Sequence, residues 1–249
     1  MIIPDSIESI EVIQVSRIRY RSLLPIYLLV IAGFVMLAAG GSRAVTVLSV
    51  NAPVGDRKTV VIDAGHGGVD GGATSCTGVL ESQFNLEIAL KLDDLMHLLG
   101  INTVMIRKTD CSIYTQGQTI SQKKISDLKE RVRIVNSIDD CALISIHQNH
   151  FSDSRYSGAQ VFYASTEGSR NLANALQMTM IRAINPGSHR KIKKADSIYL
   201  MQHITCPGVL IECGFLSNPQ EELLLRNHTY QQKLCSVIAC TVSTWLFGS

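Results

Sequence analysis

Short runs of apolar residues recur along this chain, and three of them end at or near a histidine or a glutamate. The runs and the residues that follow them are Thr59–Ala64 with His66, Ala142–Ile146 with His147, and Val209–Ile211 with Glu212. A continuous run of Val, Ile and Leu is typical of a strand that is buried on both faces, as in a parallel sheet. Ligands of open α/β sheets bind outside the carboxyl ends of such strands. The pattern therefore predicts that these polar side chains meet at one edge of a sheet.

Between these runs, apolar residues recur with the period of a helix that has one buried face. The expected helices are Phe84–Leu99, Ser126–Ser137, Glu167–Ile184, Pro219–Arg226 and Tyr230–Phe247. Two further strands are expected at Asn102–Ile106 and Gly158–Ala164, and the polar segment Cys111–Lys124 is expected to be a loop. Alternating strands and helices predict an α/β fold with a single twisted, mostly parallel sheet and helices on both faces.

The N-terminal part of the chain has a different pattern. Residues 23–40 are almost entirely apolar, and 18 helical residues just span a hydrocarbon core of about 30 Å. Three arginines between positions 17 and 21 precede this run, which predicts a cytoplasmic N-terminus. Small residues at 38–41 leave a cleaved signal peptide open, but the run is longer than a usual signal core. We therefore predict that an N-terminal transmembrane helix precedes the α/β domain.

These patterns divide the chain into four predicted segments. They are a cytoplasmic tail (1–22), a transmembrane anchor or signal segment (23–41), a linker (42–58) and a catalytic domain (59–249). The prediction for localisation is a single-pass protein of the cell membrane with its catalytic domain on the extracytoplasmic side.

Composition restricts the class of protein. The chain is 46% hydrophobic and 18% charged with a formal net charge of +2, which is ordinary for a globular protein and gives no case for nucleic-acid binding. The seven cysteines are scattered without a CxxC pair, so a disulfide framework is not indicated and at least one thiol stays unpaired within the chain. We expect several of them to be small core residues.

Two histidines and two glutamates fit a catalytic zinc site. Zinc binds imidazole nitrogen and carboxylate oxygen, and catalytic sites use three protein ligands and keep one position open. His66, Glu81 and His147 would supply these ligands for one zinc ion per chain. Glu212 would then take a proton from the attacking water and pass it to the leaving amine. The set predicts metal-assisted hydrolysis of an amide.

Several of these residues also have a structural interpretation. Glu81 could complement the dipole of the helix that follows it, and Glu212 could be an ordinary buried acid with a partner. Arg131 could contact the substrate, but an ion pair with Asp63 or Asp110 fits its place on a helix better.

Other residues carry weaker hypotheses. Asn149 could hydrogen-bond the substrate amide, and His150 could be a fourth ligand or lie exposed in a loop. Cys213 could act as a nucleophile, but that hypothesis leaves His66 and Glu81 without a role. The basic stretch 189–194 could attract anionic groups of a substrate or be a solvated loop.

Several motifs within residues 59–246 resemble those of the zinc-dependent N-acetylmuramoyl-L-alanine amidases of the amidase_3 type. They are VIDAGHGGVDGGA at 61–73, Glu81 with Asn85-Leu86, Arg107 with Asp110, Arg131 with Val135-Asn136, SIHQN at 145–149 and PGVLIECGFLSN at 207–218. The resemblance implies that His66, Glu81 and His147 bind zinc and that Glu212 is the catalytic carboxylate. It also implies the substrate, the amide between N-acetylmuramic acid and L-alanine in peptidoglycan.

Within this family the chain is most similar to the sporulation and germination type. The similarity rests on the single membrane segment, the lack of wall-binding repeats, and the sequence from Glu212 to Pro219. It implies removal of stem peptides in the spore cortex, which allows muramic-δ-lactam to form. It also implies that the catalytic domain lies between the two forespore membranes. An activating protein partner is a further option. Lys108, His150 and the long N-terminal tail depart from the family pattern, but none of the four key positions does.

Two other classes of function remain open at this point. One is a non-catalytic peptidoglycan-binding or regulatory module that keeps the amidase fold. The other is a zinc peptidase that cuts within the stem peptide.

Overall fold

The computed structural model describes residues 58–248. The predicted cytoplasmic tail, the predicted membrane segment and nearly all of the predicted linker lie outside the described residues. Between residues 58 and 248, no helix combines the length and the apolar character needed to cross a membrane.

The strands of the described residues form a six-stranded sheet in the order β2-β1-β3-β6-β4-β5. They are β1 (Thr59–Ala64), β2 (Thr103–Met105), β3 (Cys141–Asn149), β4 (Gln160–Tyr163), β5 (Lys193–Lys194) and β6 (Gly208–Phe215). Strands β2, β1, β3 and β6 are parallel to one another, whereas β4 runs antiparallel to β6. The predicted α/β fold with a mostly parallel sheet is confirmed.

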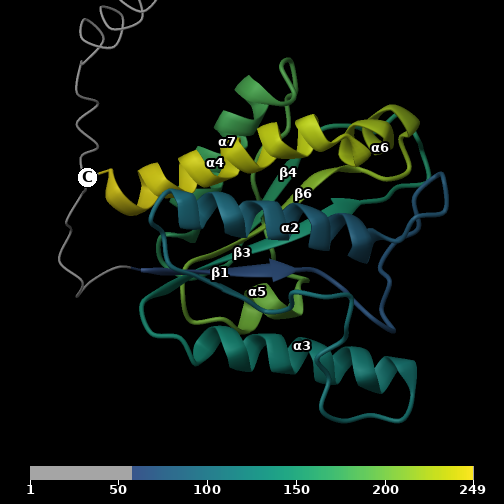
Figure 1. Ribbon diagram of the computed structural model, residues 1–249, viewed down its shortest axis with the longest axis vertical. Coiled ribbons are helices and arrows are strands. Elements are labelled where there is room, and N and C mark those ends of the chain that lie inside the picture. Colours follow the sequence, from purple (N-terminus) through teal and green to yellow (C-terminus); the bar gives the residue numbers. More distant parts are fainter. Residues whose placement is uncertain (1–57, 249) are drawn as a thin grey trace, which may run out of the picture. The chain divides into compact units, whose positions relative to one another are not determined.

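Helices cover both faces of this sheet, as predicted (Figure 1). The helices of one face are α2 (Glu81–Leu98), α4 (Ser169–Ala183), α6 (Pro219–Arg226) and α7 (His228–Phe247), and those of the other face are α3 (Ile120–Asn136) and α5 (Tyr199–His203). Residues 60–62 of β1 are all apolar because both faces of the strand are buried. Val60 and Ile62 pack into the larger core with α2, α4 and α7, and Val61 packs into the smaller core with α3 and α5.

Three parts of the fold differ from the expectation. The segment Cys111–Lys124, predicted as a loop, contains the first residues of α3, because Thr119 caps this helix in a capping box with Gln122. Strand β5 has two residues and helix α5 has five, which is too short for either to show a hydrophobic period. Helix α2 begins at Glu81, ahead of the apolar positions from Phe84 onward that predict it.

Strands β3 and β6 extend beyond the apolar runs that predict them. Strand β3 continues through His147 to Asn149, and β6 continues through Glu212 to Phe215. His147 and Glu212 are paired in register on these neighbouring strands. Both residues therefore stand on the sheet itself rather than in the loops after it, and this support restricts their movement.

Candidate metal centre and active site

The turn after β1 brings His66 next to His147. His66 has φ = 61°, a left-handed backbone conformation that is uncommon for a residue other than glycine and that clusters at functional sites. Arg131 holds this turn by donating to the carbonyl oxygens of Ala64 at 3.1 Å and of His66 at 2.8 Å. A Cβ at Gly65 would overlap the His147 ring, so only glycine allows the turn to pass this close.

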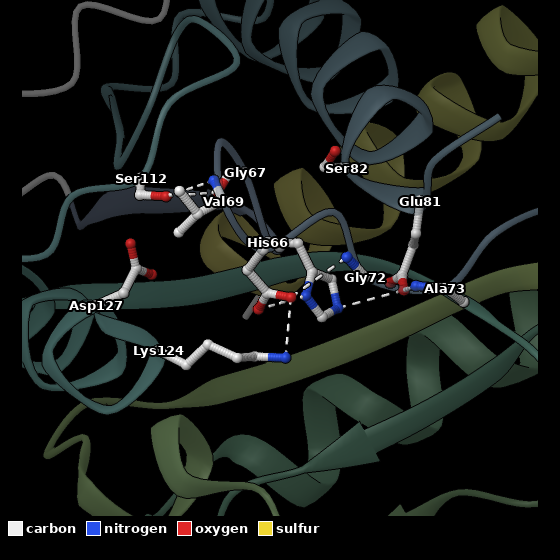
Figure 2. Close-up of polar contacts among 12 residues, drawn as sticks. His66, Gly67, Val69, Gly72, Ala73, Glu81, Ser82, Ser112, Lys124 and Asp127 are labelled. Atoms are coloured by element: carbon white, nitrogen blue, oxygen red, sulfur yellow. Dashed lines mark hydrogen bonds and ion pairs between the residues drawn. The ribbon is translucent and has the colours of Figure 1, made fainter. Parts of the chain in front are cut away.

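Glu81 bridges the two histidines. Its Oε2 lies 3.2 Å from Nε2 of His66 (Figure 2), and its Oε1 lies 3.0 Å from Nδ1 of His147. The two imidazole rings are edge-to-face with centroids 4.9 Å apart. Candidate ligand atoms of all three residues lie within 4.8 Å of one another. The structure therefore brings together the three predicted metal ligands.

The loop after His66 and the start of α2 form one local unit. The carbonyl oxygens of Gly71 and Ala73 accept from the first two backbone N–H groups of α2, at 3.0 and 2.8 Å. These bonds satisfy donors that a helix leaves unpaired at its N-terminus. In return, Oε2 of Glu81 accepts from the N–H of Ala73 at 3.0 Å, and Gly72 lies beside the same carboxylate (Figure 2).

Asp70 supports His66 from the side away from Glu81. Its Oδ2 lies 2.9 Å from Nδ1 of His66, and its Oδ1 lies 2.9 Å from Nζ of Lys124. Burial alone would lower the pKa of His66, but the hydrogen bonds with Asp70 and Glu81 outweigh it and raise this pKa to about 9. A metal-ligating histidine commonly has its second ring nitrogen on a carboxylate, which fixes the ring, and Asp70 occupies that position.

Asn85 supports Glu81 in the same way. This fully buried residue donates from Nδ2 to Oε1 of Glu81 at 3.2 Å and to the carbonyl oxygen of Gly65 at 3.1 Å. Burial tends to raise the pKa of Glu81, but the hydrogen bonds with His147 and His66 outweigh it and hold this pKa well below its usual range. Glu81 is therefore an ionised carboxylate with a fixed orientation.

Glu212 lies beside the three ligands without joining them. The residue is half-buried, and its Oε2 is buried with no hydrogen-bond partner among residues 58–248. Burial raises the pKa of Glu212 to about 7; His147 and His66 oppose this shift, and the charge of Glu81 adds to it. A carboxylate with a free oxygen and a pKa near neutrality can both accept and donate a proton in catalysis.

The residues present fit the zinc ion that the resemblance implies. Two imidazole nitrogens and one carboxylate oxygen are a donor set of catalytic zinc sites. Glycine at position 72 lets the backbone pass close to two of these ligands, because a Cβ there would lie 2.6 Å from Oε2 of Glu81 and 2.8 Å from Cδ2 of His66. The unpaired Oε2 of Glu212 supplies a proton acceptor at the same place.

Arg131 is buried among protein partners. Its side chain is 2% exposed, pairs with Asp63, and binds Oδ2 of Asp127 at 2.6 Å. Asp63 also accepts from Oγ of Ser145 at 2.6 Å. The expected ion pair is confirmed with Asp63 rather than Asp110, and a contact of Arg131 with the substrate stays a prediction. Arg131 is a positioning residue for the His66 turn.

Replacing Arg131 by methionine is expected to lower the free energy of unfolding by about 3–5 kcal/mol, because it leaves the Asp63 carboxylate buried without its counter-ion. Urea denaturation of the purified protein measures this change. Arg133→Met is the matched control on the same helix, since Arg133 is exposed and pairs with Glu130 at the surface. An equal loss in both variants would contradict the assigned role of Arg131.

The remaining candidates occupy different places. His150 is exposed and lies outside the ligand group. Cys213 is fully buried in the larger core, and burial raises the pKa of its thiol well above the usual range, so the nucleophile hypothesis fails. Asn149 is half-buried at the end of β3, paired in register with Phe215, and its contact with a substrate stays a prediction.

The sequence predicts no role for three residues that support the site, namely Asp70, Asn85 and Arg107. Asp70 lies four residues after His66, and Asn85 lies one helical turn after Glu81, so spacing could have found both. Arg107 has no such local signal. It reaches back from the residues after β2 to the carbonyl oxygens at positions 64 and 65, at 2.8 and 3.0 Å.

Comparison with known proteins assigns the family. Residues 60–243 match Amidase_3, described as N-acetylmuramoyl-L-alanine amidase. The chain belongs to this family. The amidase is 38% identical over 183 residues to the germination-specific N-acetylmuramoyl-L-alanine amidase of Bacillus subtilis (strain 168), which covers 73% of this chain and 76% of that protein. The predicted family and the predicted likeness to the germination type are confirmed.

Solved structures agree with this assignment. The amidase is similar to the CwlD amidase from Clostridioides difficile in complex with the GerS lipoprotein, with a TM-score of 0.74 and 37% identity over 78% of this chain and 100% of that chain. It is also similar to an N-acetylmuramoyl-L-alanine amidase from Clostridium difficile 630, with a TM-score of 0.67 and 31% identity over 76% of this chain and 97% of that chain. The chain is therefore an enzyme of the amidase class.

Proposed function

We propose that this amidase uses one zinc ion to hydrolyse the bond between N-acetylmuramic acid and L-alanine in peptidoglycan. The observation that carries the proposal is the approach of His66, Glu81 and His147 to within 4.8 Å, with Glu212 on the neighbouring strand. The first three residues would hold the metal, and Glu212 would handle the proton. Membership of the amidase family supports the identity of the bond.

Each residue has a defined part in the reaction. When bound, zinc supplies a Lewis acid that polarises the scissile carbonyl and makes a water more acidic. Glu212 accepts a proton from the attacking water at its unpaired Oε2 and then delivers that proton to the leaving nitrogen of alanine. Its pKa of about 7 suits both transfers near neutral pH. Asp70 keeps the His66 ring in one orientation through its contact with Nδ1.

We also propose the biological setting. Similarity to a germination-specific amidase supports removal of stem peptides in the spore cortex, which would allow muramic-δ-lactam to form. The arginine-flanked apolar segment at 23–41 supports a membrane anchor, with the catalytic domain outside the cytoplasm and between the forespore membranes. The CwlD structure holds a lipoprotein partner, which supports an activating protein for this chain too.

Digestion of peptidoglycan tests the function. Full-length protein, loaded with zinc and assayed alone and with a co-expressed lipoprotein partner, is incubated with purified peptidoglycan, and the soluble products are identified by mass spectrometry. The expected products are intact stem peptides that begin with a free alanine amine. Peptides cut internally would support the zinc peptidase instead. Binding to the wall without any product in either assay would support the non-catalytic module.

A further inference from the structure

An exposed pair of aromatic rings lies beside the strand that carries Glu212. Phe151 and Tyr156 are 50% and 47% exposed, yet their rings are packed edge-to-face with centroids 4.7 Å apart. The Tyr156 ring lies 6.2 Å from the ring of Phe215, the last residue of β6. Two large aromatic side chains that are packed together at the surface are typical of a binding surface rather than of a core.

Tyr156 also lines a hollow of about 560 Å³. The other lining residues are Ser157, Gly158 and residues 185–190, which have the sequence NPGSHR. This wall presents hydroxyl, amide and backbone groups, and none of these lining residues is acidic. A concave site with aromatic surface on one side and hydroxyl, amide, imidazole and guanidinium groups on the other has the general character of a small-ligand site.

The hollow adjoins the active site through β4. Gln160 of β4 is paired in register with Glu212. Arg190, in the wall of the hollow, donates to Oε1 of Gln160 at 3.3 Å. Phe215 lies on the same strand as Glu212, three residues further on. The hollow is therefore separated from the catalytic carboxylate by Gln160 of β4, and the aromatic pair lies at the end of the strand that carries this carboxylate.

Arg190 is a wall residue and not a free anion receptor. Its Nε donates to the carbonyl oxygen of Ser157 at 2.8 Å, and its Cζ lies 4.7 Å from the centroid of the Phe215 ring. Together with the bond to Gln160, these contacts tie the guanidinium to three protein groups. The exposed rings and the hydrogen-bonding groups of the wall thus define the chemistry of the surface, which holds no acidic side chain. They fit a pyranose ring, which offers a C–H face for stacking and hydroxyl groups for hydrogen bonds.

We propose that Phe151, Tyr156 and the hollow bind a sugar of the glycan strand next to the muramic acid whose stem peptide is removed. We call this surface the glycan site. The proposal rests on the proposed function, since it takes the substrate to be peptidoglycan. In this proposal, the bound glycan strand runs from the metal ligands past β4 to Phe151, Tyr156 and the hollow.

Binding of a peptide-free oligosaccharide tests the glycan site without any hydrolysis. The probe is a tetrasaccharide of alternating N-acetylglucosamine and N-acetylmuramic acid with no stem peptides, titrated into the zinc-loaded full-length protein by calorimetry. Phe151→Ala and Tyr156→Ala are expected to weaken binding about ten-fold each, because each removes a stacking surface. Phe247→Ala is the matched control, since this phenylalanine is 52% exposed at the far end of α7.

Absence of binding by the wild-type protein, or equal affinity of all four proteins, would overturn the glycan site. Unchanged unfolding midpoints confirm that the two alanine variants are folded, which their half-exposed positions lead us to expect.

Hydrolysis provides a second, separate readout. The two alanine variants are expected to raise KM for polymeric peptidoglycan about ten-fold, with kcat/KM unchanged for N-acetylmuramoyl peptides that carry a single sugar. Equal losses on both substrates would mean that the surface holds the stem peptide, and this result would overturn the proposal. Failure of the proposed function is distinguishable, because the wild-type protein would then cleave neither substrate.

Discussion

Glu212→Gln is expected to lower kcat for hydrolysis of the muramoyl–alanine amide by about 10²–10⁴-fold, because glutamine cannot accept the proton of the attacking water. The substitution keeps the shape of the side chain and adds no charge to the buried position on β6. Zinc content should stay at about one ion per chain, since Glu212 lies outside the group of three ligands. Release of stem peptides, followed by mass spectrometry, measures kcat, and elemental analysis measures the metal.

The matched control for this prediction is Glu167→Gln, which changes an exposed glutamate close to the start of α4. Its activity should equal that of the wild-type protein. Loss of zinc in Glu212→Gln would identify Glu212 as a ligand instead of a base. Full activity in Glu212→Gln would remove it from the mechanism.

The raised pKa of Glu212 has a consequence for the pH profile. A general base is active only when it is ionised, and burial raises the pKa of this carboxyl to about 7. Activity should therefore fall as the pH decreases through a value above the range near 4.3 of an ordinary glutamate and, because a bound zinc ion favours the ionised carboxylate, no higher than about 7. The residual activity of Glu212→Gln should lack this decrease.

His147→Ala is expected to abolish both metal binding and hydrolysis. The substitution removes one of three ligands and leaves a pair that holds zinc weakly. After dialysis against metal-free buffer, zinc content should drop from about one ion per chain to near zero, and release of stem peptides should fall to background. Both quantities are measured on the same preparation.

His150→Ala provides a closely matched control for the loss of His147. His150 is an exposed histidine three residues further along the chain and lies outside the ligand group. Its replacement should leave zinc content and activity unchanged. If His150→Ala released as much zinc as His147→Ala, the assignment of ligands would be wrong.

The parts of the fold that sequence predicts best are those whose signal is local. The sequence predicts strand β1 with its observed bounds, because residues on both of its faces are buried and Val60–Ile62 are therefore continuously apolar. The same reasoning does not reach the ends of β3 and β6. His147 and Glu212 are polar and belong to strands because their backbones pair with each other across the sheet. Strand propensity depends on such neighbours more than on the residue itself.

In the site, too, the sequence predicts what depends on local signals and misses what depends on distant contacts. Histidine or glutamate next to an apolar run predicts His66 and His147 as ligands and Glu212 as the base, whereas Glu81 follows a glycine-rich stretch. The partner of Arg131 required the structure, because Asp63 and Asp110 are equally plausible in the sequence. The sequence shows a glycine at position 65 but not the reason for it. In the structure, the His147 ring lies against Gly65 and leaves no room for a side chain.

The origin of the three ligands affects how a bound metal would leave. His66 and Glu81 belong to one short stretch, whose loop caps the helix that Glu81 begins, whereas His147 stands on an interior strand. Fraying of the first turn of α2 would withdraw Glu81, while Arg131 keeps the His66 turn in place and the sheet stays intact. The residence time of the metal would then depend on this local opening and not on unfolding of the domain. Such an enzyme can exchange its metal while it stays folded.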